Sequence, residues 1–296
     1  MKFTGERYIP SEKGIIRYEH LHRYALARSL AAGKRVLDIA SGEGYGSAML
    51  AEVAHDVVGV DIDRESVAHA TQSYAQASHP NTRFVVGSCD AVPLPDDSFD
   101  LIVSFETIEH HDHHEEMMGE MKRLLKADGV LVLSSPNRPT FNRLLPAPNH
   151  FHLHEVDRQE LTQLLLRYFR YAKIFGQQTF AGSFTIALDR NALSQIQCLS
   201  PDGIPLVPPP APTFFVAICS DSIESLPHLT DSALIDWDDD VIVGMFTRHL
   251  QIQKYMSAEI ESLRHELLAI THLKIWKLAS HYWSWRDHMG RWLKRT

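Results

Sequence analysis

The chain has 296 residues, of which 44% are hydrophobic and 22% are charged, and its formal net charge is −8. This composition is typical of a globular protein, and the length allows one large α/β domain plus an appendage. The acidic balance disfavours nucleic acid as the main partner, because phosphate contacts need a basic face. The three cysteines lack metal or disulfide spacing, and the chain shows neither a signal-peptide pattern nor an apolar run of about 18 residues. We therefore expect a cytoplasmic protein.

The first 33 residues are predicted to form an N-terminal cap helix. Apolar residues recur at helical spacing from about residue 18 to residue 32. Arg23 lies within this helix and has two interpretations. It is either a charge on a solvated helix face or a carboxylate partner close to the Gly-rich turn that follows.

A short apolar strand, residues 35–39, runs into a turn of small residues that we call the Gly-rich turn (residues 40–46). A helical pattern follows it over residues 47–54. Such a unit brings backbone N–H groups and a helix N-terminus close to a ligand. Gly42 and Gly44 remove the Cβ atoms that would block this approach. Alone, the turn fits a simple strand-to-helix connection as well as a nucleotide site.

Strands and helices alternate along the next part of the chain. This alternation predicts an α/β fold with a doubly wound, Rossmann-like, seven-stranded and mostly parallel sheet over residues 34–220. Within it we interpret residues 177–213 as an insertion forming a surface loop rather than a cover for the active site. Residues 136–154 are expected to be irregular, and residues 214–220 to form a last, antiparallel strand at the sheet edge. Further strands are expected at 56–63, 83–88, 99–105, 129–136 and 171–176, and helices at 65–77, 117–125 and 155–169.

Taken together, residues 34–177 resemble a class I S-adenosylmethionine (SAM) dependent methyltransferase, with the family's motifs in order. Asp61 lies about 20 residues past the Gly-rich turn, where a carboxylate binds ribose hydroxyls in Rossmann-type domains. Ala40 stands where the family more often has Gly, and alanine is tolerated there if its φ is negative. The resemblance implies that SAM is the cofactor and that Phe105 lies near its methyl group. It further implies that Asp61 binds the ribose, that Ile62 packs against the adenine, and that Asp90, beside Ala91, accepts from the adenine amino group. The residues implied for the methionine part are Asp38, Ala40, Ser41, Gly42 and Gly44.

Several segments are similar to methyltransferases of bacterial O-antigen and other surface-polysaccharide biosynthesis. They are residues 4–8, 18–24, 42–47, 135–138 and 149–155. The similarity implies a sugar hydroxyl as the methyl acceptor, at the end of a lipid-carried glycan. Two alternatives stay open: a methyltransferase of a quinone or other small lipid-like acceptor, and a non-catalytic SAM-binding scaffold that recruits a glycosyltransferase.

A sugar hydroxyl is a poor acid, so methyl transfer to it needs a positioned base or a metal ion. His152 is the first choice as general base and His110 the second, with Glu109 beside them in the sequence motif. The pattern Glu106, Glu109 and His110 also resembles the Glu-x-x-Glu-His metal site of quinone-biosynthetic and small-RNA 3′-end O-methyltransferases. That resemblance implies a divalent ion on these three residues. In metal-free relatives a nearly identical pattern caps a helix or orients the substrate, and both interpretations stay open.

Residues 221–240 are acidic and are interpreted as a linker, followed by a helical extension over residues 241–296. Five apolar residues form a short heptad seam, which fits a coiled coil in a homo-oligomer or docking on the main domain. The end of the chain mixes Trp with Lys and Arg, which suits either the inner membrane surface or a partner protein such as a glycosyltransferase. The seam consists of Met256, Ile260, Leu263, Leu267 and Ile270.

Overall fold

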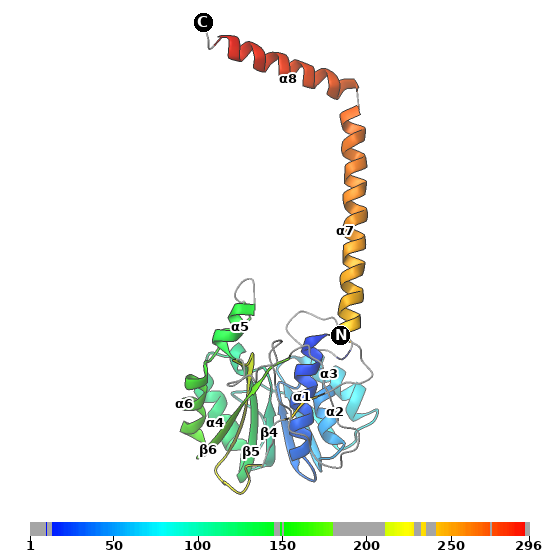
Figure 1. Cartoon of the computed structure of the whole chain (residues 1–296). Coiled ribbons are helices and arrows are strands. Elements are labelled where there is room, and N and C mark those ends of the chain that lie inside the picture. The colour runs from blue at the N-terminus through cyan, green and yellow to red at the C-terminus, as the bar shows by residue number, and fades with distance from the viewer. Residues whose placement is uncertain are drawn as a thin grey trace, which may run out of the picture. The chain divides into compact units, whose positions relative to one another are not determined.

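The structure is a computed structural model of the chain. It describes residues 10, 14–144, 149, 151–179, 211–227, 232–234, 241–272 and 274–293, so His150 and most of the predicted insertion lie outside the described residues. The chain divides into two compact units, Met1–Ile235 and Asp236–Thr296. The first unit contains the sheet and its covering helices, and the second contains two long helices (Figure 1).

A seven-stranded sheet with the order β3-β2-β1-β4-β5-β7-β6 forms the centre of the first unit. Strands β1 to β5 are parallel, and β7 runs antiparallel to its two neighbours. This arrangement confirms the predicted doubly wound, Rossmann-like fold. The strands are β1 Arg35–Ile39, β2 Asp56–Asp61, β3 Thr82–Val86, β4 Phe99–Ser104, β5 Leu125–Pro136, β6 Tyr171–Gln177 and β7 Phe214–Ser220.

The last strand, β7, is antiparallel as predicted, but it lies between β5 and β6, so the prediction of an edge position was wrong. All seven side chains of β7 are buried, whereas β6 alternates between exposed and partly buried positions. A continuous apolar run is typical of a strand that is covered on both faces. The strand at this edge of the sheet is therefore β6, although β7 comes last in the chain.

Helices cover both faces of the sheet and bury one apolar cluster on each. One cluster contains side chains of α4 and α6, and the other contains side chains of α1 and α2. Neighbouring strand residues contribute to opposite clusters, as Val36 and Leu37 of β1 do, because successive strand side chains point to opposite faces. The helices of this unit are α1 Ile15–Leu30, α2 Tyr45–Ala51, α3 Arg64–Ala70, α4 His114–Leu124, α5 Arg138–Leu144 and α6 Arg158–Tyr168.

Helix α5 lies in the stretch that the sequence predicted to be irregular. Pro139 occupies its first turn, where the missing N–H of proline costs no hydrogen bond. The Asn137 carbonyl accepts hydrogen bonds from the N–H groups of Thr140 and Phe141. Pro136 ends β5 as expected, but it is followed almost at once by this short helix.

The second unit contains two helices, α7 Val241–His272 and α8 Lys274–Leu293. Both lie within residues 241–296, where the sequence predicts a helical extension. Among the described residues, no helix is both long enough and apolar enough to cross a membrane. The beginning of the acidic stretch at 221–240 belongs to the first unit. There Asp221 pairs with Lys122 and accepts a hydrogen bond from the N–H of Arg170, and Leu226 is buried.

Candidate active site

The Gly-rich turn follows β1 at the point where the strand order reverses. Strands β1 and β4 are neighbours, and the helices that follow them, α2 and α4, cover opposite faces of the sheet. In open α/β sheets the crevice at such a switch point, outside the carboxyl ends of the strands, is where ligands bind. A Cβ atom built on Gly42 would meet no heavy atom within 4 Å, so the backbone of the turn faces open space there.

Backbone conformation in this turn is left-handed at Ala40, with a φ of 59°, and at Gly42 and Gly44, with φ values of 56° and 92°. The condition of a negative φ at Ala40 is therefore not met. A left-handed conformation costs an L-residue about 1–2 kcal/mol, so the turn stores strain at the position where the family more often has glycine.

Asp61, at the end of β2, is fixed beside the turn by two backbone N–H groups. Its Oδ2 accepts from Gly42 N at 2.8 Å and its Oδ1 accepts from Asp63 N at 2.9 Å. Each carboxylate oxygen can accept a second hydrogen bond, as binding of ribose hydroxyls requires. The next side chain, Ile62, is 70% exposed, which leaves its apolar surface available to a flat aromatic base.

Asp38 is fully buried and is surrounded by hydroxyl groups of the chain itself. It accepts hydrogen bonds from Ser47 Oγ at 2.6 Å and from Tyr24 Oη at 3.1 Å. Burial raises the pKa of Asp38 to about 7, and the hydrogen bonds from Ser47 and Tyr24 partly oppose that rise. Asp38 thus ties α1 and α2 to β1. Nearby, the buried hydroxyl of Ser41 makes no hydrogen bond with the described residues.

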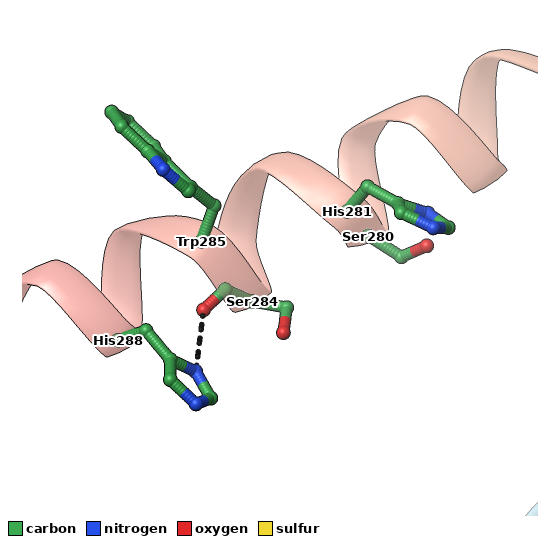
Figure 2. A pocket seen from close by; sticks show the side chains of 5 residues that line it. All are labelled: Ser280, His281, Ser284, Trp285 and His288. Atoms are coloured by element: carbon green, nitrogen blue, oxygen red, sulfur yellow. Dashed lines mark hydrogen bonds between the residues drawn. The ribbon is translucent and has the colours of Figure 1, made fainter.

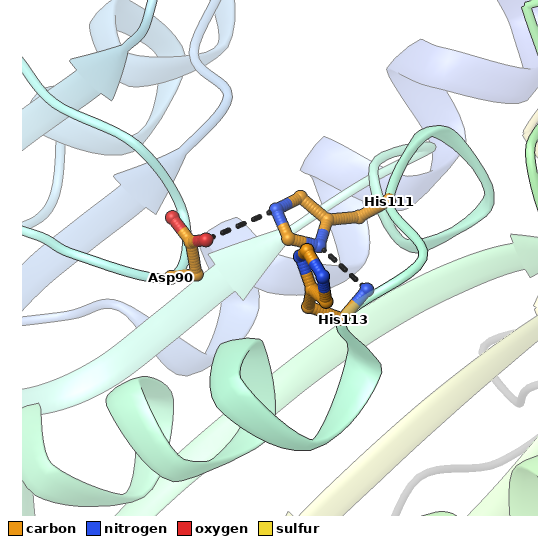
Figure 3. A group of neighbouring side chains, drawn as sticks. All are labelled: Asp90, His111 and His113. Atoms are coloured by element: carbon orange, nitrogen blue, oxygen red, sulfur yellow. Dashed lines mark hydrogen bonds and ion pairs between the residues drawn. The ribbon is translucent and has the colours of Figure 1, made fainter.

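Asp90 follows β3 and meets two histidines from the turn after β4 (Figure 3). Its carboxylate accepts from the Ser88 hydroxyl and lies 3.3 Å from Nε2 of His111. The Ser88 hydrogen bond is the main reason why the pKa of Asp90 lies below its usual value. One ligand atom each from Asp90, His111 and His113 lies within 4.8 Å of the others. Ala91, beside Asp90, is exposed.

Arg23 is buried and does not lie on a solvated helix face. Its Nε donates to Gln177 Oε1 at 2.7 Å, its Nη1 lies 3.2 Å from Glu106 Oε1, and its guanidinium covers the ring of Phe214. Glu106 also accepts from Ser134 Oγ at 2.7 Å. The interpretation as a solvated charge was therefore wrong, and the carboxylate that Arg23 pairs with in the structure is Glu106. Its predicted place in cofactor binding stays a prediction.

Phe105, at the end of β4, is also buried. Its ring packs edge-on against Tyr24, with 5.0 Å between the ring centroids. Since Tyr24 donates a hydrogen bond to Asp38, one side chain of α1 links Phe105 to Asp38 in β1.

The histidine expected to act as base belongs to a compact group of side chains. Ligand atoms of Glu109, His110 and His152 lie within 4.8 Å of one another. His110 Nδ1 contacts the Phe151 carbonyl oxygen at 2.9 Å, and the two histidine rings lie edge to face. Glu109 is buried and its Oε2 makes no hydrogen bond with the described residues. Burial, and then the charge of Glu106, raise the pKa of Glu109 well above its usual value.

Glu106 is not part of this group, since its carboxylate is engaged by Arg23 and Ser134. The predicted metal set of Glu106, Glu109 and His110 is thus not gathered as the sequence pattern suggests. His152 takes the third place instead. Its segment is brought to Glu109 by backbone hydrogen bonds from Leu153 N and His154 N to the Glu109 carbonyl oxygen.

Glu155 was not predicted to take part in the site. Its Oε1 lies 2.6 Å from Nδ1 of His152, and both side chains are less than one-tenth exposed. Their spacing of three residues indicates that His152 and Glu155 can contact each other, but it does not indicate that the pair is buried. Tyr24 and Ser134 were also missed, because their partners Asp38 and Glu106 come from distant parts of the chain.

Residues 37–133 match the protein family described as methyltransferase domain. This part of the chain is therefore similar to methyltransferase domains. A probable SAM-dependent methyltransferase of Mycolicibacterium smegmatis is 38% identical over 168 residues, which cover 56% of this chain and 63% of the relative. A ubiquinone biosynthesis O-methyltransferase of Haemophilus ducreyi is 32% identical over 115 residues, covering 36% of this chain and 47% of the relative.

The chain spans less than two-thirds of the length of these curated relatives. A solved structure of a Pyrococcus horikoshii protein has a TM-score of 0.52 at 19% identity, with 74% of this chain and 95% of that chain covered, and shows the same fold. The sequence matches support a class I SAM-dependent methyltransferase domain, with SAM as its cofactor. They leave the acceptor unspecified.

Proposed function

We propose that the protein is a SAM-dependent O-methyltransferase that acts on a sugar hydroxyl in surface-polysaccharide biosynthesis. The observation that carries this proposal is the buried pair of His152 and Glu155 next to Glu109. A histidine whose second nitrogen is held by a carboxylate is the usual arrangement for removing a proton from an alcohol.

The residues around the Gly-rich turn fit SAM. Gly42 faces open space, Asp61 is held ready to accept from ribose hydroxyls, and Ile62 exposes apolar surface for the adenine. The buried hydroxyl of Ser41 makes no hydrogen bond with the described residues, and the methionine part of SAM would supply a partner for it. When bound, SAM supplies a methyl group activated by its sulfonium. The chain must then align the acceptor and remove its proton.

His152 is the proposed base. The Glu155 carboxylate holds the proton of the imidazole on Nδ1, which leaves Nε2 as the atom that accepts the hydroxyl proton. Glu109 is held toward its neutral form by its raised pKa. A neutral carboxyl group can donate a hydrogen bond to an acceptor oxygen, so Glu109 is assigned to orienting the substrate.

A polyhydroxyl acceptor fits the polar character of this group. The Oε2 atoms of Glu109 and Glu155 are buried and make no hydrogen bond with the described residues. Leaving a buried polar atom without a hydrogen bond costs about 1–3 kcal/mol, and a substrate hydroxyl would supply the missing partner of Glu109.

A quinone or other small lipid-like acceptor is the second candidate. Phe151 and Leu153, on either side of His152, are exposed and would provide an apolar surface for it. One of the relatives described above is named as a methyltransferase of ubiquinone biosynthesis.

A divalent metal ion is an alternative to a protein base. Glu109, His110 and His152 form a mixed oxygen and nitrogen ligand set, which suits several divalent ions. Purified enzyme that keeps its full activity after EDTA treatment would remove the metal from the proposal. Activity lost on chelation and restored by one metal would replace the base by that metal.

The acceptor is tested by the intact mass of surface glycans from cells with and without the protein. We expect glycan chains from the deletion strain to be lighter by one CH₂ group. The wild-type gene and the control His55→Gln, which alters an exposed histidine, should restore the mass, whereas His152→Gln should not. Unchanged glycans together with undermethylated quinones would exclude the sugar and favour the second candidate.

A further inference from the structure

Helix α8 exposes a row of apolar side chains. Leu278, Tyr282, Trp285 and Met289 recur at intervals of four, three and four residues, so they share one side of the helix. They are exposed by 71%, 59%, 60% and 41%. Figure 2 shows Trp285 projecting away from the polar side chains of Ser280, Ser284 and His288. These large apolar side chains thus form a continuous exposed stripe.

The same helix is basic in a chain that is acidic as a whole. The sequence of α8 contains a single acidic residue, Asp287, and four basic residues, which are Lys274, Lys277, Arg286 and Arg291. The net charge of the whole chain is −8. Lys277 and Arg286 are exposed. This local excess of positive charge is complementary to a negatively charged surface.

We propose that α8 binds the surface of an anionic lipid bilayer. Leu278, Tyr282, Trp285 and Met289 enter the boundary between headgroups and acyl chains, and Lys277 and Arg286 contact lipid phosphates. Trp and Tyr favour this boundary because one end of each ring system is apolar and the other is polar. Basic side chains close to an anionic leaflet add electrostatic attraction. A helix with an exposed apolar stripe and flanking basic residues suits an orientation in the plane of the interface.

The chemistry of this face favours lipid over a second copy of the chain. A heptad seam of mixed aliphatic residues is typical of helix pairing, and that pattern is found on α7, at Ile260, Leu263 and Leu267. The stripe on α8 instead combines rings with flanking cations of one sign, which would repel an identical helix. The lipid proposal is independent of which acceptor the enzyme methylates.

The test is co-sedimentation of the full chain with vesicles of phosphatidylcholine alone or of phosphatidylcholine with phosphatidylglycerol. We expect binding to the anionic vesicles, weaker binding to the neutral ones, and release as salt is raised, because salt screens exposed charges. The double variant Leu278→Ser/Trp285→Ser should bind at least tenfold more weakly. Lys277→Glu/Arg286→Glu should lose the preference for anionic lipid. Ser280→Ala/Ser284→Ala, outside the apolar stripe, is the matched control and should bind like the wild type.

Absence of wild-type binding, or equal binding by the wild type and the Leu278→Ser/Trp285→Ser variant, would overturn the proposal. Light scattering coupled to size-exclusion chromatography measures the oligomeric state of the wild type and of the same variant. If the same variant changes the oligomeric state and leaves vesicle binding unchanged, the face is an interface between copies. Circular dichroism should show that the variants retain their helical content, because the altered side chains are exposed. Vesicle binding needs neither SAM nor acceptor, so its failure would leave the proposed methyltransferase activity untouched.

Discussion

Ala40 carries a side chain on a backbone that favours glycine, with a φ of 59°. Replacing it by glycine relieves left-handed strain of about 1–2 kcal/mol, partly offset by about 0.4–1 kcal/mol from the greater freedom of glycine in the unfolded chain. We therefore expect Ala40→Gly to raise the free energy of unfolding in urea by about 0.5–1 kcal/mol. The control Ala48→Gly, inside α2, should lower it by about 1 kcal/mol. Equal destabilisation by both changes would contradict the assignment of strain.

The buried carboxyl of Asp38 makes stability depend on pH. Its pKa is raised from 3.8 in the unfolded chain to about 7 in the folded protein. The folded state therefore holds the proton more tightly, and the contribution of Asp38 to stability falls as pH rises from about 4 to about 7, then levels off. We expect Asp38→Asn to remove this slope, measured as the difference between the unfolding free energies of the two proteins across that range. Parallel pH curves for the wild type and the variant would show that Asp38 does not titrate in this way.

Glu155 is expected to act through His152 by fixing its tautomer. In a purified system with a working acceptor, His152→Gln should lower kcat by about 100-fold to 10,000-fold, the range for loss of a general base. Glu155→Gln should lower kcat less, with little change in KM and an altered pH profile. Because the two residues act as a unit, the double variant should be no slower than His152→Gln alone. Multiplicative losses in the double variant would mean that the residues act separately.

Two helix glycines differ in the space around them, and only Gly46 is packed tightly against a neighbouring helix. A Cβ atom on Gly46, in α2, would lie 1.9 Å from Cζ of Tyr24, whereas a Cβ atom on Gly119, in α4, would lie 3.8 Å from Cε1 of Tyr168. Gly46→Ala should therefore push α1 away from α2 and lower the unfolding free energy by about 1–3 kcal/mol. Gly119→Ala should raise it by about 0.5–1 kcal/mol, because alanine is the better helix former. Thermal unfolding of both variants checks the pair, and a tolerated Gly46→Ala would contradict the docking of Tyr24.

The elements themselves follow closely from local sequence patterns. Strands with continuous apolar runs, such as β1 and β2, were predicted to within two residues because their pattern is set by burial on both faces. The place of β7 inside the sheet was not predicted, because strand order depends on contacts that are distant in the sequence. Helix α5 was missed because seven residues around a proline give little periodicity to detect.

The candidate site was predicted unevenly for the same reason. The spacing of Asp61 to the Gly-rich turn predicted that the two lie close together, and the structure joins them through one hydrogen bond. The pairing of Arg23 with Glu106 joins positions 83 residues apart, so sequence spacing contains no signal for it. The positive φ at Ala40 likewise depends on the whole turn and contradicts the residue type found there.

At the scale of the whole molecule, the central claim is that the first unit binds SAM through the Gly-rich turn and Asp61. Isothermal titration of the full chain with SAM tests it most directly. We predict binding in the micromolar range for the wild type and for Asp96→Ala, an exposed control position. Asp61→Ala should bind at least about tenfold more weakly, because it loses charge-assisted hydrogen bonds. Absence of binding by the folded wild-type protein, or equal affinity in Asp61→Ala, would contradict the account.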